Sequence, residues 1–589
     1  MSVEEIVVLC IVAGIALIII ATCLIALARK RRVLEMLAER FGRPSERAYD
    51  DWDFDQISQL FKLFPHQGKE AVDDITWNDL AMPLMFQQMN HSVSHVGDEY
   101  FYRHIRTQQY GDLGRLERHV RYFDAHPDIR LRLQYAFSKI NAAGSPSRLA
   151  SGSTPSQRPL GSNGAARKAN SYFEHLKDPG SFPKTSILPS AVIFVAAVAS
   201  ILSNFFLNPD DGISILAMVA VFMGSMIYFR VFITKTAGFI SSLKTLAATA
   251  VACIQIAKLD PVEFDKELSV LQPALKKLRR KSQAMLNLVN VCFMQNKSTS
   301  FLSIITIWFG LYGFVYAWVA SVIRKSTEEA LVFYDMIGYI ELSIGQSSYR
   351  RSLPYYCHPE FTEDACVSFE GLYHPLLKDP VANTKSVGPR FIITGANASG
   401  KSTFAKTLAI NALSAQTLDI CFARGLSLRP ACVYTTMKLE DDIVSGDSFY
   451  VAEIKRLKGF LDSLGDSSYK MFFADEILKG TNTTERIAAA AAVLKRFAEN
   501  DCFFCLTTHD TELTGILQNF YANYHFEEIT TDAEIHYDYK LYDGVTPGSN
   551  AIALLKYTHY DHSIVDEALG LEQHYLSSRE WEVLSPTGQ

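Results

Sequence analysis

One short stretch of the chain has the residue types and spacing of a phosphate-binding loop. The letters GANASGKS, Gly395–Ser402, fit the pattern G-x-x-x-x-G-K-S, in which backbone N–H groups surround phosphate oxygens and the following helix adds its dipole. We expect Lys401 to reach the β- and γ-phosphates of ATP, and Ser402 to supply a hydroxyl ligand to Mg²⁺. The apolar run RFIIT before the loop and the helical pattern after it give the strand–turn–helix context that such a loop requires. The other expected nucleotide contacts are Gly395, Asn397, Gly400 and Thr403.

Two further apolar strands end in residues that could act on the phosphates. MFFA runs into Asp475 and Glu476, and CFFCLTT runs into His509. Asp475 could hold Mg²⁺ through water, while Glu476 could polarise the attacking water. His509 could sense or orient the γ-phosphate, although a histidine at such a place, taken singly, is more often structural. Three strands that each deliver a polar residue at the carboxyl end of a parallel sheet predict an α/β nucleotide site.

The order and spacing of these segments resemble the MutS-like ATPases over almost the whole stretch from Gly371 to Leu569. The resemblance rests on YHPLLKDPVAN, GANASGKST, LRPACVYTTMKLEDDIVSGDSFYVAEI, ADEILKGTNTTE, TTHDTEL, NYHFEE and DGVTPGSNAIALL. It implies an ABC-like α/β ATPase domain that uses ATP and Mg²⁺, and it implies that His525 contacts the adenine.

The resemblance also implies a dimer with two composite ATP sites. Ser448 would be the signature serine that completes the partner subunit's ATP site, and Gly480 to Thr483 would lie at the dimer interface. Without the family, Ser448 would be an ordinary helix cap after Asp447.

Upstream, the likeness is weaker, and parts of the pattern are missing. The segment DDITWNDLAMPLMFQQMNHSVSHVGDEYFYRHIRT resembles the family's helical core, with Gly97 and Arg106 at matching places. Helices between about Thr236 and Ser300 occupy the place of the family's levers, where the basic run KKLRRK could meet a phosphate backbone or form a solvated helix face. The family's mismatch-reading domain inserts a Phe-x-Glu triplet into the duplex, and no such domain is expected here. The Phe-x-Glu triplets of this chain lie in or beside the ATPase region and are treated as coincidence.

Apolar runs predict three membrane spans. Ile6–Ala28 has 23 residues without a charge and is followed by four basic residues, Arg29–Arg32, which favours an anchor with its amino terminus outside. An uncleaved, non-spanning targeting segment is the alternative. Ile187–Leu207 and Ile213–Phe229 flank NPDDG and predict a hairpin that turns outside; a buried helical pair in a soluble core is the alternative. A fourth run, Phe301–Ile323, is interpreted as non-spanning, because a fourth crossing would place the ATP site outside.

The net charge and the cysteine content limit which classes of protein the sequence supports. The net charge of −6 gives no global electrostatic argument for nucleic acid, so any basic surface must be local. Ten cysteines in 589 residues do not predict a disulfide framework. Cys502 and Cys505 lie in one predicted strand, where positions three apart point to opposite faces, so we expect them in the core.

The sequence thus predicts an α-helical, membrane-anchored body followed by a carboxyl-terminal α/β P-loop ATPase of the ABC-like MutS type. The expected segments are an anchor (1–32), a helical core-like domain (33–140), a disordered basic linker (141–180), a transmembrane hairpin (181–235), a helical lever-like region (236–370), the ATPase (371–578) and a tail (579–589). We expect a multi-pass protein of the inner membrane with its ATPase in the cytoplasm.

For function, the leading hypothesis is an ATP-driven dimeric clamp that binds DNA, duplex or branched rather than mismatched. The rival is an ATP-gated switch on a membrane or protein partner, without nucleic acid. A transporter is a weaker third hypothesis, because three spans per subunit make a poor pathway.

Overall fold

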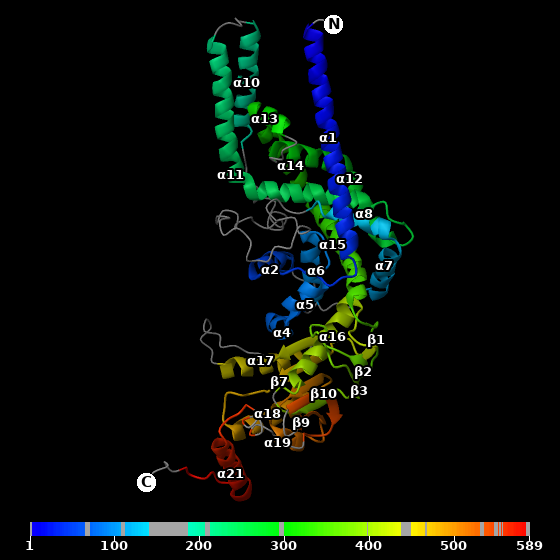
Figure 1. Cartoon of the computed structure of the whole chain (residues 1–589), viewed down its shortest axis with the longest axis vertical. Helices are drawn as coiled ribbons and strands as arrows, with labels where there is room; N and C mark the ends of the chain where they lie inside the picture. The colour runs from blue at the N-terminus through cyan, green and yellow to red at the C-terminus, as the bar shows by residue number, and fades with distance from the viewer. Residues whose placement is uncertain are drawn as a thin grey trace. The chain divides into compact units, whose positions relative to one another are not determined.

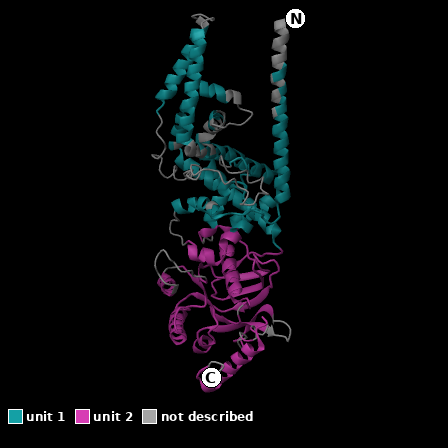
Figure 2. Cartoon of the chain, turned by 60° about the vertical axis from the view of Figure 1, so that its left-hand side comes forward, with its two compact units in different colours: residues 1–67, 86–104, 114–353 teal, residues 68–85, 105–113, 354–589 magenta. Residues whose placement is uncertain are grey.

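A computed structural model of the chain divides into two compact units (Figure 2). It describes residues 3–64, 71–107, 112–140, 186–206, 212–293, 300–396, 398–437, 449–465, 468–530, 535–546, 552, 555 and 558–584. Unit 1 comprises residues 1–67, 86–104 and 114–353, and unit 2 comprises residues 68–85, 105–113 and 354–589. The predicted linker lies outside the described residues.

Unit 1 is helical in its described part (Figure 1). Its helices are α1 (Val3–Arg40), α2 (Asp51–Ile57), α3 (Gln59–Leu63), α7 (Leu113–Ala125), α8 (Pro127–Phe137), α10 (Leu188–Phe206), α11 (Gly212–Ile256), α12 (Asp265–Phe293), α13 (Ser300–Trp308), α14 (Leu311–Arg324) and α15 (Thr327–Ser352). Helices α5 (Met82–Met89) and α6 (His95–Arg106) have residues in both units, and the first residue of α7, Leu113, belongs to unit 2. Large aromatic side chains, among them Phe123, Phe264, Tyr312 and Phe333, are completely buried and form the centre of this core.

Two residues of unit 1 explain why a glycine stands in α6. A Cβ added at Gly97 would collide with the carboxylate of Glu341 from α15. That carboxylate accepts hydrogen bonds from the backbone N–H groups of Val93 (2.8 Å) and Ser94 (3.1 Å), just before α6 begins. The glycine therefore allows a buried acid to approach the amino terminus of α6, where the helix dipole favours negative charge.

One helix of the described chain is both long and apolar enough to cross a membrane, the segment Gly212–Thr236 of α11. Its side chains are largely exposed, with Ile213 73% and Leu216 69% exposed. The preceding apolar segment, Leu188–Asn204 in α10, packs beside α11 but falls short of the length required (Figure 1). The expected anchor lies within the continuous helix α1. Three spans accordingly stay a prediction.

The apolar run 301–323 is not one continuous helix. It is divided into α13 and α14 around Gly310, which has a φ of +63°. A Cβ at Gly310 would lie 3.0 Å from the backbone oxygen of Ser190, so the break also lets α10 approach closely. That the run does not span the membrane stays a prediction.

Unit 2 contains two sheets. The smaller has the order β1 (Glu360–Phe361), β5 (Gly425–Leu428), β2 (Val367–Leu372) and β3 (Asn383–Val387). The larger has the order β10 (Ile535–Asp543), β9 (Ala522–Thr530), β4 (Arg390–Thr394), β8 (Phe503–Thr507), β7 (Lys470–Asp475) and β6 (Cys432–Thr436). All neighbours in the larger sheet are parallel except β9 and β10. The α/β class predicted for this region is therefore confirmed.

Helices cover the larger sheet because its strands are apolar on both faces. One face packs on α17 (Phe449–Ser463), α18 (Thr483–Ala498) and α19 (Thr511–Ile516). Helix α16 (Lys401–Leu418) also packs on this sheet, and α21 (His562–Ser578) lies toward the carboxyl end of the chain. Cys502 belongs to the core with α17 and α18, whereas Cys505 does not, and both are buried. They are core residues on opposite faces, as the alternation predicts.

A short amino-terminal helix, α4 (Asp74–Asp79), belongs to unit 2 although the sequence assigned it to the helical domain 33–140. It packs on β6, an edge strand of the larger sheet. Arg106 lies 4.9 Å from the ring centroid of Trp77 and pairs with Asp74, and its backbone oxygen accepts a hydrogen bond from Val72 (2.8 Å). The two short inserts of unit 2 are thus joined to each other as well as to the sheet.

Candidate active site

The phosphate-binding loop has the backbone that its glycines predict. Strand β4 ends at Thr394, and α16 begins at Lys401. Gly395 and Gly400 have φ values of +147° and +106°, which side chains other than glycine rarely adopt. A Cβ at Gly395 would lie 3.0 Å from the backbone oxygen of Phe526, so this glycine also permits a close approach to β9. Asn397 lies outside the described residues.

Lys401 is buried, and its ammonium group donates to the loop itself. Nζ lies 2.8 Å from the backbone oxygens of both Gly395 and Ala396, and 3.2 Å from Nε2 of His509. Burial lowers the pKa of Lys401, while the nearby carboxylates of Asp475 and Glu476 oppose that shift. A charged ammonium held by neutral carbonyls can exchange them for phosphate oxygens when a nucleotide binds.

Sheet register brings the three predicted strands to one edge. Thr507 pairs with Ile393 of β4 on one side and with Asp475 of β7 on the other. Residues that follow these positions, namely the phosphate loop, Glu476 and His509, therefore emerge beside one another, as predicted from parallel strands. Oδ1 of Asp475 accepts a hydrogen bond from the Thr507 hydroxyl, which fixes the carboxylate at the end of β7.

Glu476 is held by two cationic or polar partners. Its Oε1 lies 3.0 Å from Nε2 of His509, and its Oε2 lies 2.8 Å from Nζ of Lys479. The hydrogen bond with His509 is the main reason why the pKa of Glu476 falls to about 2; burial opposes the shift and Lys479 adds to it. Glu476 has a φ of +52°, and its N–H donates to the backbone oxygen of Thr507 at 2.8 Å. The backbone therefore turns sharply where the carboxylate must point.

Nε2 of His509 lies within hydrogen-bonding distance of both Lys401 and Glu476. One of these contacts needs Nε2 as an acceptor and the other needs it as a donor. With a proton on Nε2 it donates to Glu476; with the proton on Nδ1 only, it accepts from Lys401. His509 thus lies where a shift of one proton exchanges the partners of the lysine and the glutamate. This position suits the sensing role predicted for it.

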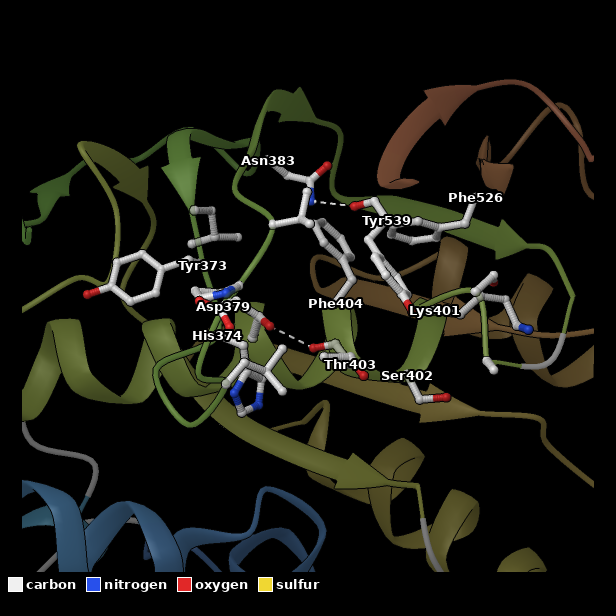
Figure 3. A pocket seen from close by; sticks show the side chains of 18 of the residues that line it. Tyr373, His374, Asp379, Asn383, Lys401, Ser402, Thr403, Phe404, Phe526 and Tyr539 are labelled. Atoms are coloured by element: carbon white, nitrogen blue, oxygen red, sulfur yellow. Dashed lines mark hydrogen bonds between the residues drawn. The ribbon is translucent and has the colours of Figure 1, made fainter. Parts of the chain in front are cut away.

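A cavity of about 520 Å³ opens over the loop (Figure 3). Ser402, Thr403, Lys401, Glu476 and His509 all line it, which brings together most of the predicted residues. Ser399 also lines the cavity. Its Oγ is buried and has no hydrogen-bond partner in the described part of the chain. An unpaired buried hydroxyl beside a phosphate-type loop is suited to a ligand oxygen.

The sequence did not point to the aromatic side of this cavity. Phe526 and Tyr539 line it, and a Cβ at Gly400 would lie 3.1 Å from Cδ1 of Tyr539. Tyr539 has a φ of +55° at an irregularity in the pairing of β9 with β10. The amide of Asn383 donates to its backbone oxygen at 3.0 Å, as the dashed line in Figure 3 shows. No motif marks this tyrosine; aromatic residues at alternate positions of YDYKLY were the only available signal.

Three predicted residues of the described chain are not among those that line the cavity: Gly395, Asp475 and His525. His525 lies on β9, is 7% exposed, and its Nδ1 is 3.3 Å from the backbone oxygen of Gly544. Its predicted contact with adenine stays a prediction. Ser448 lies outside the described residues. In the predicted interface loop, a Cβ at Gly480 would lie 2.8 Å from Cβ of Tyr450, so this glycine allows the loop to approach α17.

Comparison with known proteins finds similarity in the carboxyl-terminal region of the chain. Residues 391–575 match the family model for MutS domain V. Over 261 residues the chain is 30% identical to MutS protein homolog 4 of Mus musculus, covering 41% of this chain and 27% of that protein. It is 29% identical over 264 residues to the DNA mismatch repair protein MutS of Aquifex pyrophilus, covering 42% and 30%. It is 27% identical over 225 residues to that of Natronomonas pharaonis, covering 36% and 26%.

The matches confirm the predicted resemblance to MutS-type ATPases for the carboxyl-terminal unit. The chain spans less than a third of the length of these relatives. The family model matches within the carboxyl-terminal unit, and most of the length of each relative is unmatched.

Proposed function

We propose that this protein is a membrane-anchored ATP hydrolase whose MutS-type domain binds ATP with Mg²⁺ in the cavity over Gly395–Ser402. The observation that carries the proposal is the meeting of Lys401, Glu476 and His509 at the edge of that cavity. A phosphate loop with its lysine and a carboxylate that can position water suit hydrolysis of a nucleoside triphosphate. Here both lie at the ends of parallel strands of one sheet, and His509 follows the strand between them.

The residues present fit the proposed ligands. Among the described residues, the buried hydroxyl of Ser399 has no hydrogen-bond partner, and the ammonium of Lys401 is held by two neutral carbonyls and a histidine. Ser402 would hold Mg²⁺ directly and Asp475 through water, and the metal would neutralise charge on the phosphates. Tyr539 and Phe526 would lie along the apolar side of the cavity, where a base could stack.

Glu476 would position and polarise the attacking water rather than take a full proton in the arrangement seen. A carboxylate with a pKa of about 2 is a weak base at neutral pH, because proton transfer is most efficient when the pKa lies near the working pH. If His509 turns from Glu476 toward the γ-phosphate, the carboxylate loses its strongest stabilising partner and becomes more basic. Phosphate sensing by His509 and activation of Glu476 would then be one event.

For the whole protein, we infer a homodimeric clamp that closes on DNA when ATP binds. The support comes from the MutS-type domain and from relatives named as DNA mismatch repair proteins. Mismatch reading is not proposed, because every Phe-x-Glu triplet of this chain lies in or beside the ATPase region. Duplex or branched DNA remains the proposed substrate.

An ATP-gated switch on a membrane or protein partner is the second candidate, and two observations favour it. The net charge is −6, which opposes binding to a polyanion unless a local basic surface exists. The segment Gly212–Thr236 exposes apolar side chains along a length that fits a bilayer. We propose that this segment, the preceding α10 and the amino-terminal α1 are three spans of the inner membrane, with the ATPase in the cytoplasm.

Binding of DNA as a function of salt separates the two candidates. The detergent-solubilised protein would be titrated onto fluorescent duplex and four-way-junction DNA, with ATP, with ADP and without nucleotide, at several salt concentrations. A clamp on DNA predicts binding whose logarithm falls linearly with the logarithm of salt concentration, because counterions are released. Lys401→Ala is the control that should lose the ATP dependence. Absence of DNA binding at low salt, by protein that hydrolyses ATP, would reject the DNA clamp and leave the switch.

A further inference from the structure

Two cysteines far apart in the sequence face each other in unit 2. Cys357 and Cys421 form an isolated antiparallel bridge, in which the N–H of Cys357 donates to the oxygen of Cys421 at 3.1 Å and the reverse bond measures 2.9 Å. Directly hydrogen-bonded residues of an antiparallel pair have Cα atoms about 5.5 Å apart, inside the range that a disulfide can span. Both residues are reduced thiols, and the thiols lie within hydrogen-bonding reach of each other.

The two thiols have unequal surroundings. Cys421 is completely buried, and burial raises its pKa well above the ordinary value. Cys357 is half-buried, and the hydrogen bond from the Cys421 thiol is the main cause that lowers its pKa, with His358 adding to the effect. His358 is itself 41% exposed and is held by Asp419 at 2.9 Å. Cys357 is accordingly the accessible, thiolate-forming member of the pair, and Cys421 is the buried partner behind it.

We propose that Cys357 and Cys421 are a peroxide-sensitive dithiol site, in which Cys357 reacts first and Cys421 closes a disulfide. The Cys357 thiolate attacks one oxygen of hydrogen peroxide, the O–O bond breaks, and hydroxide leaves to give a sulfenic acid. The Cys421 sulfur then attacks the sulfur of Cys357. The S–S bond forms, the S–O bond breaks, and the Cys421 proton leaves with the hydroxyl group as water. Two thiols are oxidised while one peroxide is reduced, and an external dithiol reverses the change.

The bond would join two functionally separate parts of unit 2. Cys357 lies between Pro354, where this part of unit 2 begins, and β1. Cys421 follows the carboxyl end of α16, the helix that begins with Lys401 of the phosphate loop. Closing a loop of about 64 residues (421 − 357) restricts the unfolded chain, so the oxidised domain is expected to melt at a higher temperature than the reduced domain.

Cys366 provides a matched control within the same unit. It is half-buried like Cys357, but burial and the neighbouring Asp364 raise its pKa. The isolated β-bridge that places Cys357 opposite Cys421 does not include Cys366. Comparison of Cys357 with Cys366 therefore separates a specific thiolate site from simple accessibility.

The test is differential alkylation of the full-length protein in detergent, followed by peptide mass spectrometry, after brief treatment with limiting hydrogen peroxide at neutral pH. Wild type is expected to yield the Cys357–Cys421 disulfide, removable by dithiothreitol, while Cys366 stays reduced. Cys421→Ser is expected to stop at a sulfenic acid on Cys357 that dimedone traps, and Cys357→Ser should leave Cys421 unmodified. The wild-type experiment needs no variant to fold, so it decides the proposal alone. Oxidation of Cys366 as fast as Cys357, or failure of wild type to form the bond while Cys357 is oxidised further, would overturn it.

Discussion

Oδ2 of Asp79 accepts two hydrogen bonds at the end of β6, one from the hydroxyl of Thr435 at 2.7 Å and one from the N–H of Met437 at 2.8 Å. Asp79 and Thr435 are 356 positions apart in the chain, and both are buried. The guanidinium group of Arg456 on α17 also reaches α4, where it donates to Oγ1 of Thr76 at 3.0 Å. Helix α4 thus fixes the two chain segments that flank residues 438–448, in which the sequence places the signature serine.

Asp79→Ala is therefore expected to destabilise unit 2. The change leaves the buried hydroxyl of Thr435 without its acceptor, at a cost of about 1–3 kcal/mol. It also removes the acceptor of the half-buried N–H of Met437. Asp79→Asn keeps one amide oxygen as acceptor and should cost less. The measurement is the thermal transition that added ATP shifts upward, because that transition reports the ATP-binding unit. An unchanged transition in Asp79→Ala would contradict the role given to α4.

Glu476→Gln is expected to retain ATP binding and to lose turnover by at least about 100-fold, the range found when a positioned acid or base is removed. The side chain keeps its size, and Lys401 remains beside the loop carbonyls. Binding of a fluorescent ATP analogue and release of phosphate would be measured on the same preparation. Lys401→Ala should lose binding as well. Hydrolysis near the wild-type rate in Glu476→Gln would show that another group acts on the water.

The low pKa of Glu476 has a consequence for stability at acid pH. Its folded pKa of about 2 lies below the ordinary value of 4.5, so its ionised form is stabilised in the folded state. That contribution is fully present above pH 4.5, falls as pH decreases from 4.5 toward 2, and is absent below. The melting temperature of wild type minus that of Glu476→Gln should therefore shrink over this window. A difference that grows on acidification would mean that the carboxylate is not held by His509 and Lys479.

The sequence predicted the nucleotide edge of the sheet because that edge follows from short-range rules. Each of Gly395, Glu476 and His509 follows an apolar strand. Their proximity could be predicted from one rule, that parallel strands end at the same edge of a sheet. Tyr539 was missed because its place depends on an irregular register between β9 and β10 and on a hydrogen bond to Asn383. Neither feature leaves a pattern in the local sequence.

Long-range packing explains the remaining differences. Helix α4 lies in an amphipathic helical region by its own sequence, and its long-range contacts with β6 and with Arg456 of α17 join it to unit 2. The contact of His525 with adenine stays a prediction; its Nδ1 lies 3.3 Å from the backbone oxygen of Gly544. Tertiary contacts decide such placements, and they are not encoded in residues near the helix or the strand.

Ser448 is predicted to act on the ATP site of the partner subunit. Mixing Ser448→Arg with Lys401→Ala subunits should then restore part of the ATPase activity, because one of the two composite sites in a mixed dimer is intact. Neither variant alone should be active. The measurement is phosphate release by co-expressed, differently tagged subunits purified through both tags. Inactive mixed dimers would count against a shared site, and activity of Ser448→Arg alone would show that the serine is not needed.

The last prediction concerns the membrane. Basic residues follow the first apolar run at Arg29–Arg32, and two acidic residues, Asp210 and Asp211, lie in the predicted turn between the second and third apolar runs. Basic flanks favour the cytoplasm, so the turn is expected outside, with residues 141–171 and the ATPase inside. Single cysteines at Asp210 and Ser153, in a background without native thiols, would be treated in intact cells with a membrane-impermeant maleimide. Labelling at Asp210 alone is expected, with labelling of both positions after permeabilisation as the control.

Labelling at Ser153 in intact cells would mean that residues 141–171 lie outside, contrary to the predicted topology. Protection of Asp210 until permeabilisation would mean that α10 and α11 do not form a spanning hairpin. Their exposed apolar side chains would then have to pack against a protein surface.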